Sequence, residues 1–208
     1  MMKKSLLFPV AAIFAMSMGL WAEEPEFKSD LFKKGKLVYS DDFDGELDRE
    51  RWGAPKGKKI EKGILIIEPQ FTNREEAMKV LKRDHHLGFE PIGHLNKIPE
   101  KFVCHLRYKV EKPKLTPGRP SFQIGHHMIV LGVLEGGGHR IKLPDGPIFS
   151  EPDSKMALNE WIDLVIEYQL GKIKISVNGY SKTYEHEKVT IVNPKDKYGP
   201  RFTFKGGP

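Results

Sequence analysis

Cysteine is almost absent from this chain: among 208 residues, only position 104 holds one. A lone thiol cannot form an internal disulfide, and sites that need clustered cysteines, such as structural zinc sites, are excluded. Phe102 and Leu106 flank Cys104 at alternate positions, which predicts that the thiol faces a hydrophobic core and is inert rather than nucleophilic. The fold must therefore be held together by that core alone.

Long apolar runs are also lacking, with one exception at the beginning of the chain. Residues 6–20 are mostly apolar, follow Lys3 and Lys4, and precede Ala22 and two glutamates. This order predicts a signal peptide, residues 1–22, that is cut after Ala22. A membrane anchor is the alternative, but the run is short for a bilayer span. We therefore expect a protein exported to the periplasm or the extracellular space, with no membrane association after cleavage.

Clusters of one charge sign are missing as well, although the formal net charge is +6. Two of these charges, Lys3 and Lys4, belong to the predicted signal peptide, and the other lysines are scattered rather than interleaved with aromatic residues. A nucleic-acid-binding face is therefore not indicated. The positive excess is compatible with acidic polysaccharides, while scattered lysines are more often an ordinary solvated surface.

Spacings typical of metal sites do not occur either. There is no His-x-His pair, and His126 and His127 are neighbours on a predicted strand, where adjacent side chains point to opposite faces. Asp41, Asp42 and Asp44 offer oxygen ligands for a structural calcium ion, but their spacing fails the EF-hand pattern. We expect no cofactor and no catalytic metal, and we leave a structural calcium ion open.

Strong alternation is what the sequence does contain. Apolar residues occupy every second position in residues 162–168 and again in residues 173–177. A period of two places one set of side chains on each face of a strand. Asn178-Gly179 follows, and this pair favours the type I′ turn of a hairpin because both central residues need a positive φ. The segment is predicted to be an antiparallel meander with one buried face.

Short apolar segments separated by Gly, Pro, Asn and Asp predict further strands. They cover residues 37–43, 64–67, 78–81, 102–110, 121–124, 128–134, 139–143, 191–192 and 201–205. Residues 78–81 also fit a helical turn capped by Asn73. Two connections, 111–120 and 144–159, look long. This pattern predicts an all-β fold, a two-sheet antiparallel sandwich, formed by residues 23–208 as a single domain.

The end of the chain raises one structural question. Phe202 and Phe204 alternate as in a strand, and the chain then stops at Gly206-Gly207-Pro208. A last strand without a partner would leave an exposed ladder edge. We therefore hypothesise that the closing strand of the sandwich is missing from this sequence.

Several segments resemble concanavalin-like jelly-roll domains. These are residues 37–52, with Asp-Phe-Asp-Gly before Leu-Asp and a Trp, residues 60–66, residues 159–167 with the following Asn-Gly hairpin, and residues 197–204. The chain is most similar to exported proteins of the 3-keto-disaccharide hydrolase and laminarinase-type glycoside hydrolase group. The resemblance implies a jelly roll of two antiparallel sheets. It also implies carbohydrate, acidic polysaccharide included, as the partner of an exported monomer.

The resemblance does not extend to the laminarinase catalytic motif. Those enzymes place two Glu and one Asp at alternating positions of one strand, so that the carboxylates share a groove. The nearest segment here, Glu151-Pro152-Asp153, lacks the third acid. A carbohydrate-binding domain, a glycoside or keto-disaccharide hydrolase, and a non-catalytic laminin-G-like module therefore all stay open, and no catalytic residue is assigned.

Six residues are candidates for a binding groove. His105 and Arg107 share one face of a predicted strand, and His139 and Arg140 follow a run of three glycines. Gln123 and His127 fall on one face if their strand is regular, which resembles the Gln and His pair of alginate-lyase-type sites. Such side chains can bind sugar hydroxyls or carboxylates, and they are also common at ordinary solvated positions. Trp52 and Trp161 are expected in the core.

Overall fold

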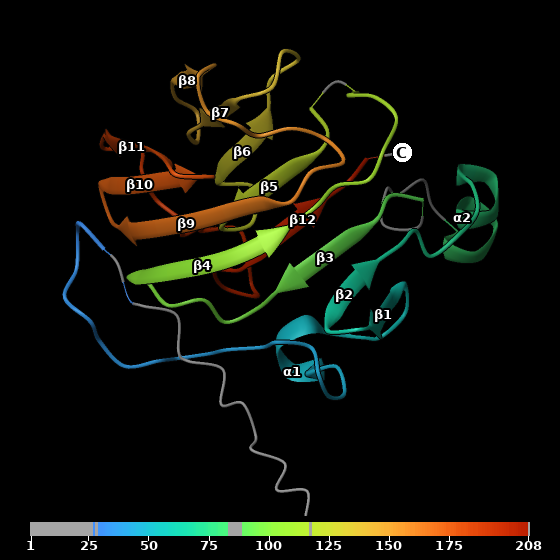
Figure 1. The fold of residues 1–208 in the computed structure, drawn as a ribbon. Coiled ribbons are helices and arrows are strands. Elements are labelled where there is room, and N and C mark those ends of the chain that lie inside the picture. The colour runs from blue at the N-terminus through green and yellow to red at the C-terminus, as the bar shows by residue number, and fades with distance from the viewer. Residues whose placement is uncertain (1–26, 28, 83–88, 117, 208) are drawn as a thin grey trace, which may run out of the picture.

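The computed structural model describes residues 27, 29–82, 89–116 and 118–207, so the predicted signal peptide lies outside the described residues. Two larger antiparallel sheets form the body of the molecule (Figure 1). In order, the six-stranded sheet contains β3 (Ile92–Leu95), β12 (Phe202–Lys205), β5 (Ser121–Ile124), β6 (Ile129–Val133), β7 (His139–Lys142) and β8 (Ile148–Glu151). The four-stranded sheet contains β11 (Tyr180–Glu185), β10 (Lys172–Val177), β9 (Ile162–Gln169) and β4 (Phe102–Tyr108).

Three small elements complete the described structure. A separate hairpin pairs β1 (Lys58–Glu61) with β2 (Ile64–Ile67), and the helices are α1 (Arg49–Trp52) and α2 (Arg74–Leu81). The hairpin packs against β3, where a Cβ on Gly93 would collide with the side chain of Ile67. Among the described residues, no helix has the length and apolar character that a membrane span requires.

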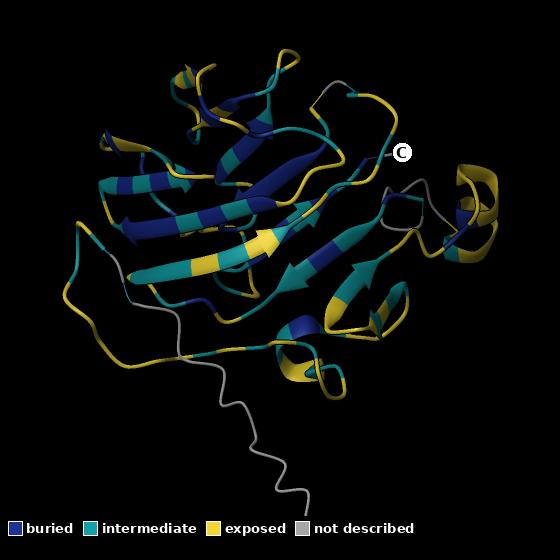
Figure 2. Cartoon of the chain, viewed as in Figure 1, coloured by how far each residue is buried: buried dark blue, intermediate teal, exposed yellow. Residues whose placement is uncertain are grey.

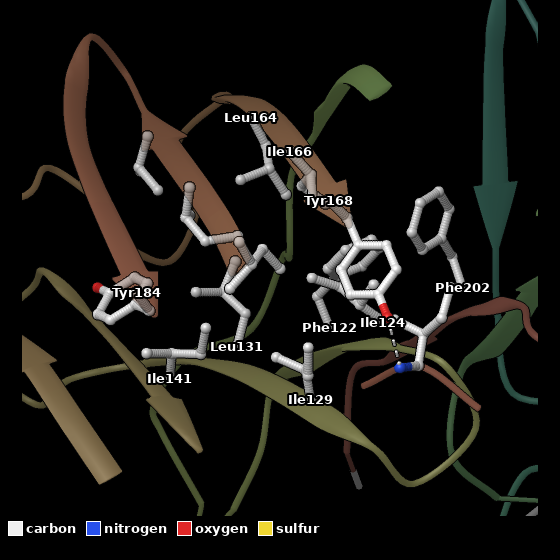
Figure 3. Close-up of a cluster of buried hydrophobic side chains, with 14 of the residues drawn as sticks. Phe122, Ile124, Ile129, Leu131, Ile141, Leu164, Ile166, Tyr168, Tyr184 and Phe202 are labelled. Atoms are coloured by element: carbon white, nitrogen blue, oxygen red, sulfur yellow. Dashed lines mark hydrogen bonds between the residues drawn. The ribbon is translucent and has the colours of Figure 1, made fainter. Parts of the chain in front are cut away.

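One hydrophobic core lies between the two larger sheets. Phe122, Ile124 and Leu131 project from the six-stranded sheet toward Leu164 and Ile166 of the other sheet, and all five are at most 1% exposed (Figure 3). The hydroxyl of Tyr168 accepts a hydrogen bond from the backbone N–H of Ile191, so its polar end is satisfied inside the core. Figure 2 shows that buried residues concentrate on the strands of the two larger sheets, while α2 is mostly exposed. The protein is therefore an all-β sandwich, as the alternation predicts.

The predicted meander is confirmed in detail. Strands β9, β10 and β11 pair in sequence order, and the apolar positions of β9 and β10 face the core. Asn178 and Gly179 both have positive φ angles, 47° and 87°, as a type I′ turn requires. The hairpin therefore closes through the turn that the Asn-Gly pair specifies.

The strand predicted at residues 37–43 is wrong. This segment has no strand pairing, and Leu37 and Val38 are more than half exposed. Phe43 adopts a positive φ of 56° while its N–H donates to Oδ1 of Asp41, a local turn that competes with extended structure. The Asp41 carboxylate also accepts a hydrogen bond from Trp52 Nε1 at 3.1 Å. Trp52 is buried, as expected.

Other boundaries differ from the prediction because local signals were ambiguous. Residues 78–81 belong to helix α2, whose Asn73 cap accepts the N–H of Glu76. Strands β1, β3 and β8 were not predicted, and β8 interrupts the supposed long connection at 144–159. No strand forms at residues 191–192.

The last strand is not an open edge. Strand β12 pairs with β3 on one side and with β5 on the other, and Thr203 is the partner of both His94 and Gln123. Since both ladders of β12 are filled, the reason given for a missing closing strand does not hold.

The segment 29–32 forms a strap on the outer face of the four-stranded sheet. Glu167 of β9 is 2% exposed, and its Oε2 accepts hydrogen bonds from Ser29 Oγ at 2.5 Å and from the N–H groups of Asp30 and Leu31. Lys174 of β10 pairs with Asp30 and lies 3.5 Å from Glu167. Burial alone would raise the pKa of Glu167, but these hydrogen bonds and the charge of Lys174 hold it below its ordinary value.

Replacing Glu167 with glutamine should release the strap. The amide offers one acceptor oxygen without the negative charge, so the charge-assisted hydrogen bonds weaken by about 1–3 kcal/mol in total. Limited trypsin digestion should then cut faster after Lys33, read by mass spectrometry. Wild type should behave in the same way at acidic pH, because a carboxylate with a lowered pKa stabilises the fold above its unfolded pKa and loses this effect as pH falls.

The control for that experiment is E185Q on β11, because Glu185 is mostly exposed and pairs with Lys172 at the surface. Equal digestion of E167Q and wild type at neutral pH would show that Glu167 does not hold the strap.

Candidate functional site

The outer face of the six-stranded sheet carries a layer of polar side chains. Along β5 and β12, Phe122 and Phe202 point into the core, and Gln123 and Thr203 point to the other side. We call the residues gathered there the outer-face cluster: His94, Gln123, His126, His127, Asp196, Arg201, Thr203 and Lys205. Gln123, Thr203 and Lys205 are each at most 5% exposed although they do not face the core. Buried polar groups of this kind need hydrogen-bond partners.

A turn brings the two adjacent histidines together. Strand β5 ends at Ile124, and the turn that follows contains Gly125 and His127 with positive φ angles of 74° and 63°. The rings of His126 and His127 therefore lie side by side, with centroids 4.0 Å apart, so the expectation of opposite faces is wrong. His127 N–H donates to Gln123 Oε1 at 3.4 Å, which ties the turn to the strand.

Three histidines of the cluster are driven toward the neutral form. Burial, with Arg201, His126, Lys58 and Lys205 nearby, lowers the pKa of His94 to about 3. His94 Nδ1 lies 3.0 Å from Thr203 Oγ1 on the neighbouring strand. Burial also lowers the pKa of His126 and of His127, in both cases with help from Arg201. At neutral pH these imidazoles can each donate and accept one hydrogen bond.

Several polar atoms of this face lack a hydrogen-bond partner. Among the described residues, four buried side-chain atoms are unsatisfied, and three of them lie here: Ser121 Oγ, Asp196 Oδ2 and Arg201 Nε. Asp196 Oδ2 does lie 3.0 Å from His126 Nδ1 and 3.7 Å from Arg201 Nη2, but neither contact has hydrogen-bond geometry. Such a concentration is uncommon in native proteins and indicates groups that are satisfied by water or by a ligand.

Positive charge exceeds negative charge on this face. Lys205, Arg201 and Arg119 supply cations, and the carboxylates near them are Glu90 and Asp196. Arg119 Nε lies 3.4 Å from Glu90 Oε2, and both side chains are mostly buried. The two carboxylates are therefore already engaged with cations, which makes them poor candidates for an acid and base pair.

The six residues predicted from the sequence lie in three different places. Gln123 and His127 belong to the outer-face cluster, and Arg140 lies further along the same face on β7. His105 and Arg107 project from the outer face of the four-stranded sheet, where His105 Nε2 lies 2.9 Å from Asp163. His139 is completely buried between the sheets. The structure thus brings together half of the predicted set.

Sequence reasoning missed His94, Thr203, Arg201 and Lys205. Alternation in residues 201–205 already placed the last three opposite to Phe202 and Phe204, so their shared face could have been inferred. His94 gave no such signal, because the short strand β3 contains Gly93 and therefore shows no clear alternation of apolar and polar residues.

His139 is part of a hydrogen-bonded chain that joins the sheets at one end. Its Nδ1 lies 2.7 Å from Ser154 Oγ and its Nε2 lies 3.1 Å from the hydroxyl of Tyr184. Glu151 then accepts from Tyr184 at 3.3 Å and from Tyr180 at 2.7 Å. The serine and histidine resemble a nucleophile and base, but Ser154 is only 3% exposed. The chain is therefore a structural link between β7, β8 and β11.

Cys104, Trp161 and Asp41 were also considered as functional residues in the sequence, and their contacts are structural. Burial raises the pKa of the Cys104 thiol to about 12, so it is not a nucleophile at neutral pH. Trp161 is 42% exposed between Arg107 and Lys109, so the expectation of a core position is wrong for it. Asp41 accepts from Tyr39, Phe43 and Trp52. In the part of the chain that the structure describes, no three metal-binding side chains converge.

Comparison with protein-family models, with curated proteins and with solved structures finds no match for this chain. Its function must therefore be argued from its own surface. Two shallow hollows of about 290 and 490 Å³ lie elsewhere, one beside α1 and β1 and one beside the 186–194 loop, and neither is lined by the outer-face cluster. The outer face is exposed at His127, Arg140 and Lys142, whereas Gln123, Thr203 and Lys205 lie beneath its surface.

Proposed function

We propose that this protein is an exported, concanavalin-like carbohydrate-binding domain whose ligand lies on the outer face of the six-stranded sheet. The observation that carries the proposal is the layer of polar side chains on this one face, where the partly exposed His126 and the exposed His127 lie side by side next to Gln123. A glycan presents many hydroxyl groups that both donate and accept hydrogen bonds, so it can pair with neutral imidazole groups of this kind.

The composition of the face also supports a polar ligand that lies across an open surface. Gln123, His94 and His127 offer amide and neutral imidazole groups, which exchange hydrogen bonds with hydroxyls without the desolvation cost of a full charge. Sugar chains are extended, so they fit an open sheet face better than a closed pocket suited to a small apolar ligand.

A hydrolase on the same face is the second reading, and the observed groups favour it less. Glycoside hydrolysis by the common route needs two carboxylic groups on either side of the bond, one of them free to donate a proton. On the outer face, Glu90 is paired with Arg119 and Asp196 faces His126 and Arg201. A laminin-G-like structural module is the third reading, and it gives the polar layer of this face no binding role.

Replacing Val130 with tryptophan should weaken glycan binding. Val130 of β6 is paired with Gln123 in the row that continues to Lys142, so a large ring there covers the face without entering the core. The matched control is V165W, which places the same ring on the outer face of the four-stranded sheet. A glycan array and a reducing-sugar release assay should be run on wild type and both variants.

Wild type and V165W are expected to bind the same glycans, with V130W at least about 10-fold weaker, which corresponds to 1.4 kcal/mol. Equal binding by V130W and V165W would move the site away from this face. Release of reducing sugar by wild type would favour the hydrolase reading, and an array without any bound glycan would contradict the proposed function.

A further inference from the structure

Two neighbouring side chains of the outer face are deeply buried and lack partners. Lys205 of β12 and Ser121 of β5 are directly opposite each other in the ladder and are 5% and 7% exposed. Among the described residues, no hydrogen bond or ion pair engages the Lys205 ammonium, and the Ser121 hydroxyl has no partner. Lys205 Nζ is not among the fully buried unsatisfied atoms, so the side chain is mostly covered while its ammonium still reaches solvent. A lysine that is mostly covered is normally paired with an anion.

The surroundings of this pair lack negative charge. Arg119 and Arg201 are close to Lys205, and the carboxylate that acts on it, Glu90, is already 3.4 Å from Arg119. Burial and then Arg119 lower the pKa of Lys205, and Glu90 only partly opposes this. An anion beside Lys205 would therefore relieve an unfavourable concentration of positive charge.

The row of residues across the sheet adds a further cation beside this pair. Beyond Ser121 the row continues with Gly132 on β6 and Arg140 on β7. Gly132 has no side chain, and the Arg140 side chain folds back over it, with Nε 3.5 Å from the place where a Cβ would lie. The row therefore presents an ammonium, a hydroxyl and a guanidinium, and each of these groups can donate hydrogen bonds.

We propose that Lys205 and Ser121, with Arg140 at the rim, form a subsite for the anionic group of an acidic sugar. A group that faces three donors must be an acceptor, and carboxylates and sulfates are acceptors with negative charge. This inference rests on the proposed function, because it names the class of glycan that the outer face binds. Uronic acids and sulfated sugars share the required chemistry.

The test compares K205M with K142M in the full chain. Lys142 is exposed on the same sheet, so K142M removes an equal charge from the same face without touching the subsite. The ligands are oligogalacturonate and its fully methyl-esterified form, which share one backbone and differ in charge, and dextran sulfate with dextran as the second pair. Affinity is measured by isothermal titration calorimetry at two salt concentrations.

For at least one of the two anionic ligands, K205M should lose about 10-fold or more in affinity, as expected for a lost charge-assisted hydrogen bond, while K142M loses less than about 3-fold. Which anionic ligand loses affinity identifies a carboxylate or a sulfate. Binding to the neutral partner of each pair should stay within about 2-fold in both variants. Equal losses in K205M and K142M would mean a long-range charge effect and would overturn the subsite.

A stability measurement separates a ligand subsite from a structural role. Without ligand, K205M should melt at a temperature equal to or above that of wild type, because methionine replaces an unpaired buried ammonium. Sodium galacturonate or sodium sulfate should raise the melting temperature of wild type more than that of K205M. A K205M protein that melts lower and binds neutral and acidic glycans equally poorly would contradict the inference.

The same data keep the two proposals apart. If wild type binds glycans and K205M binds the acidic ones with unchanged affinity, the subsite fails and the proposed function stands. If no glycan binds but small anions still stabilise wild type through Lys205, the anion site stands and the carbohydrate function fails.

Discussion

Replacing Phe122 with alanine should reduce the free energy of unfolding by about 3–5 kcal/mol, the largest loss we expect from any single substitution discussed above. Phe122 is 1% exposed, and its ring lies 4.8 Å from that of Phe204 and 5.2 Å from that of Phe202 (Figure 3). Truncation removes the buried ring and leaves a cavity that rigid β-strands on both sides fill poorly. Urea denaturation followed by circular dichroism measures the change.

A loss of this size approaches the total stability of many domains, so a second, milder variant is measured beside F122A. F122L keeps most of the apolar area and should show about half the loss. V38A, on an exposed residue of the unpaired segment, should stay within about 0.5 kcal/mol of wild type. If F122L were as stable as V38A, the two sheets would not pack through this ring.

Acid should destabilise the protein well above the pH at which carboxylates are protonated. The pKa of His94 falls from 6.5 to about 3 on folding. Between these two values, His94 is protonated in the unfolded chain and neutral in the folded protein. Stability is therefore complete above pH 6.5 and decreases as pH falls toward 3. Between pH 7 and pH 4 this single residue should account for at most about 3 kcal/mol, less if the partly exposed ring is screened by solvent.

The experiment is urea denaturation of wild type and H94Q at pH 7, 5.5 and 4. Glutamine can still contact Thr203 but does not titrate, so the difference in stability between the two proteins should shrink or reverse as pH falls. The remaining pH dependence of H94Q belongs to His126, His127 and His139, whose pKa values burial also lowers, and to Glu167. Parallel curves for wild type and H94Q would rule out a neutral buried His94.

Alternating side chains were enough to predict the sandwich, because apolar and polar residues alternate along a strand that buries one face. Residues 162–185 show this best, since the apolar positions and the Asn-Gly turn agree with each other. The failures occur where a local contact overrides the pattern. The backbone N–H of Phe43 donates to Asp41, and the chain turns there. Strand β3 has a glycine at position 93, because the packed side chain of Ile67 leaves no room for a Cβ.

The outer-face cluster was predictable only in part. Gln123 and His127 are four residues apart, so their contact is local, even though a turn rather than a regular strand creates it. The pairing of β3, β12 and β5 places His94 in the same row as Gln123, and Lys205 beside Ser121. These strands are distant in the chain. Register between distant strands depends on the packed fold, so a single sequence contains little information about it.

The strap and the outer-face cluster lie on opposite sides of the molecule. The strap is pinned to Glu167 on one sheet, and the cluster lies beyond the core on the far side of the other sheet. A sensor chip or an affinity bead coupled through the residues before Ser29 would therefore be attached on the side of the four-stranded sheet. In that orientation the histidine and lysine surface points to the solution, and immobilised protein should keep full access to large glycans.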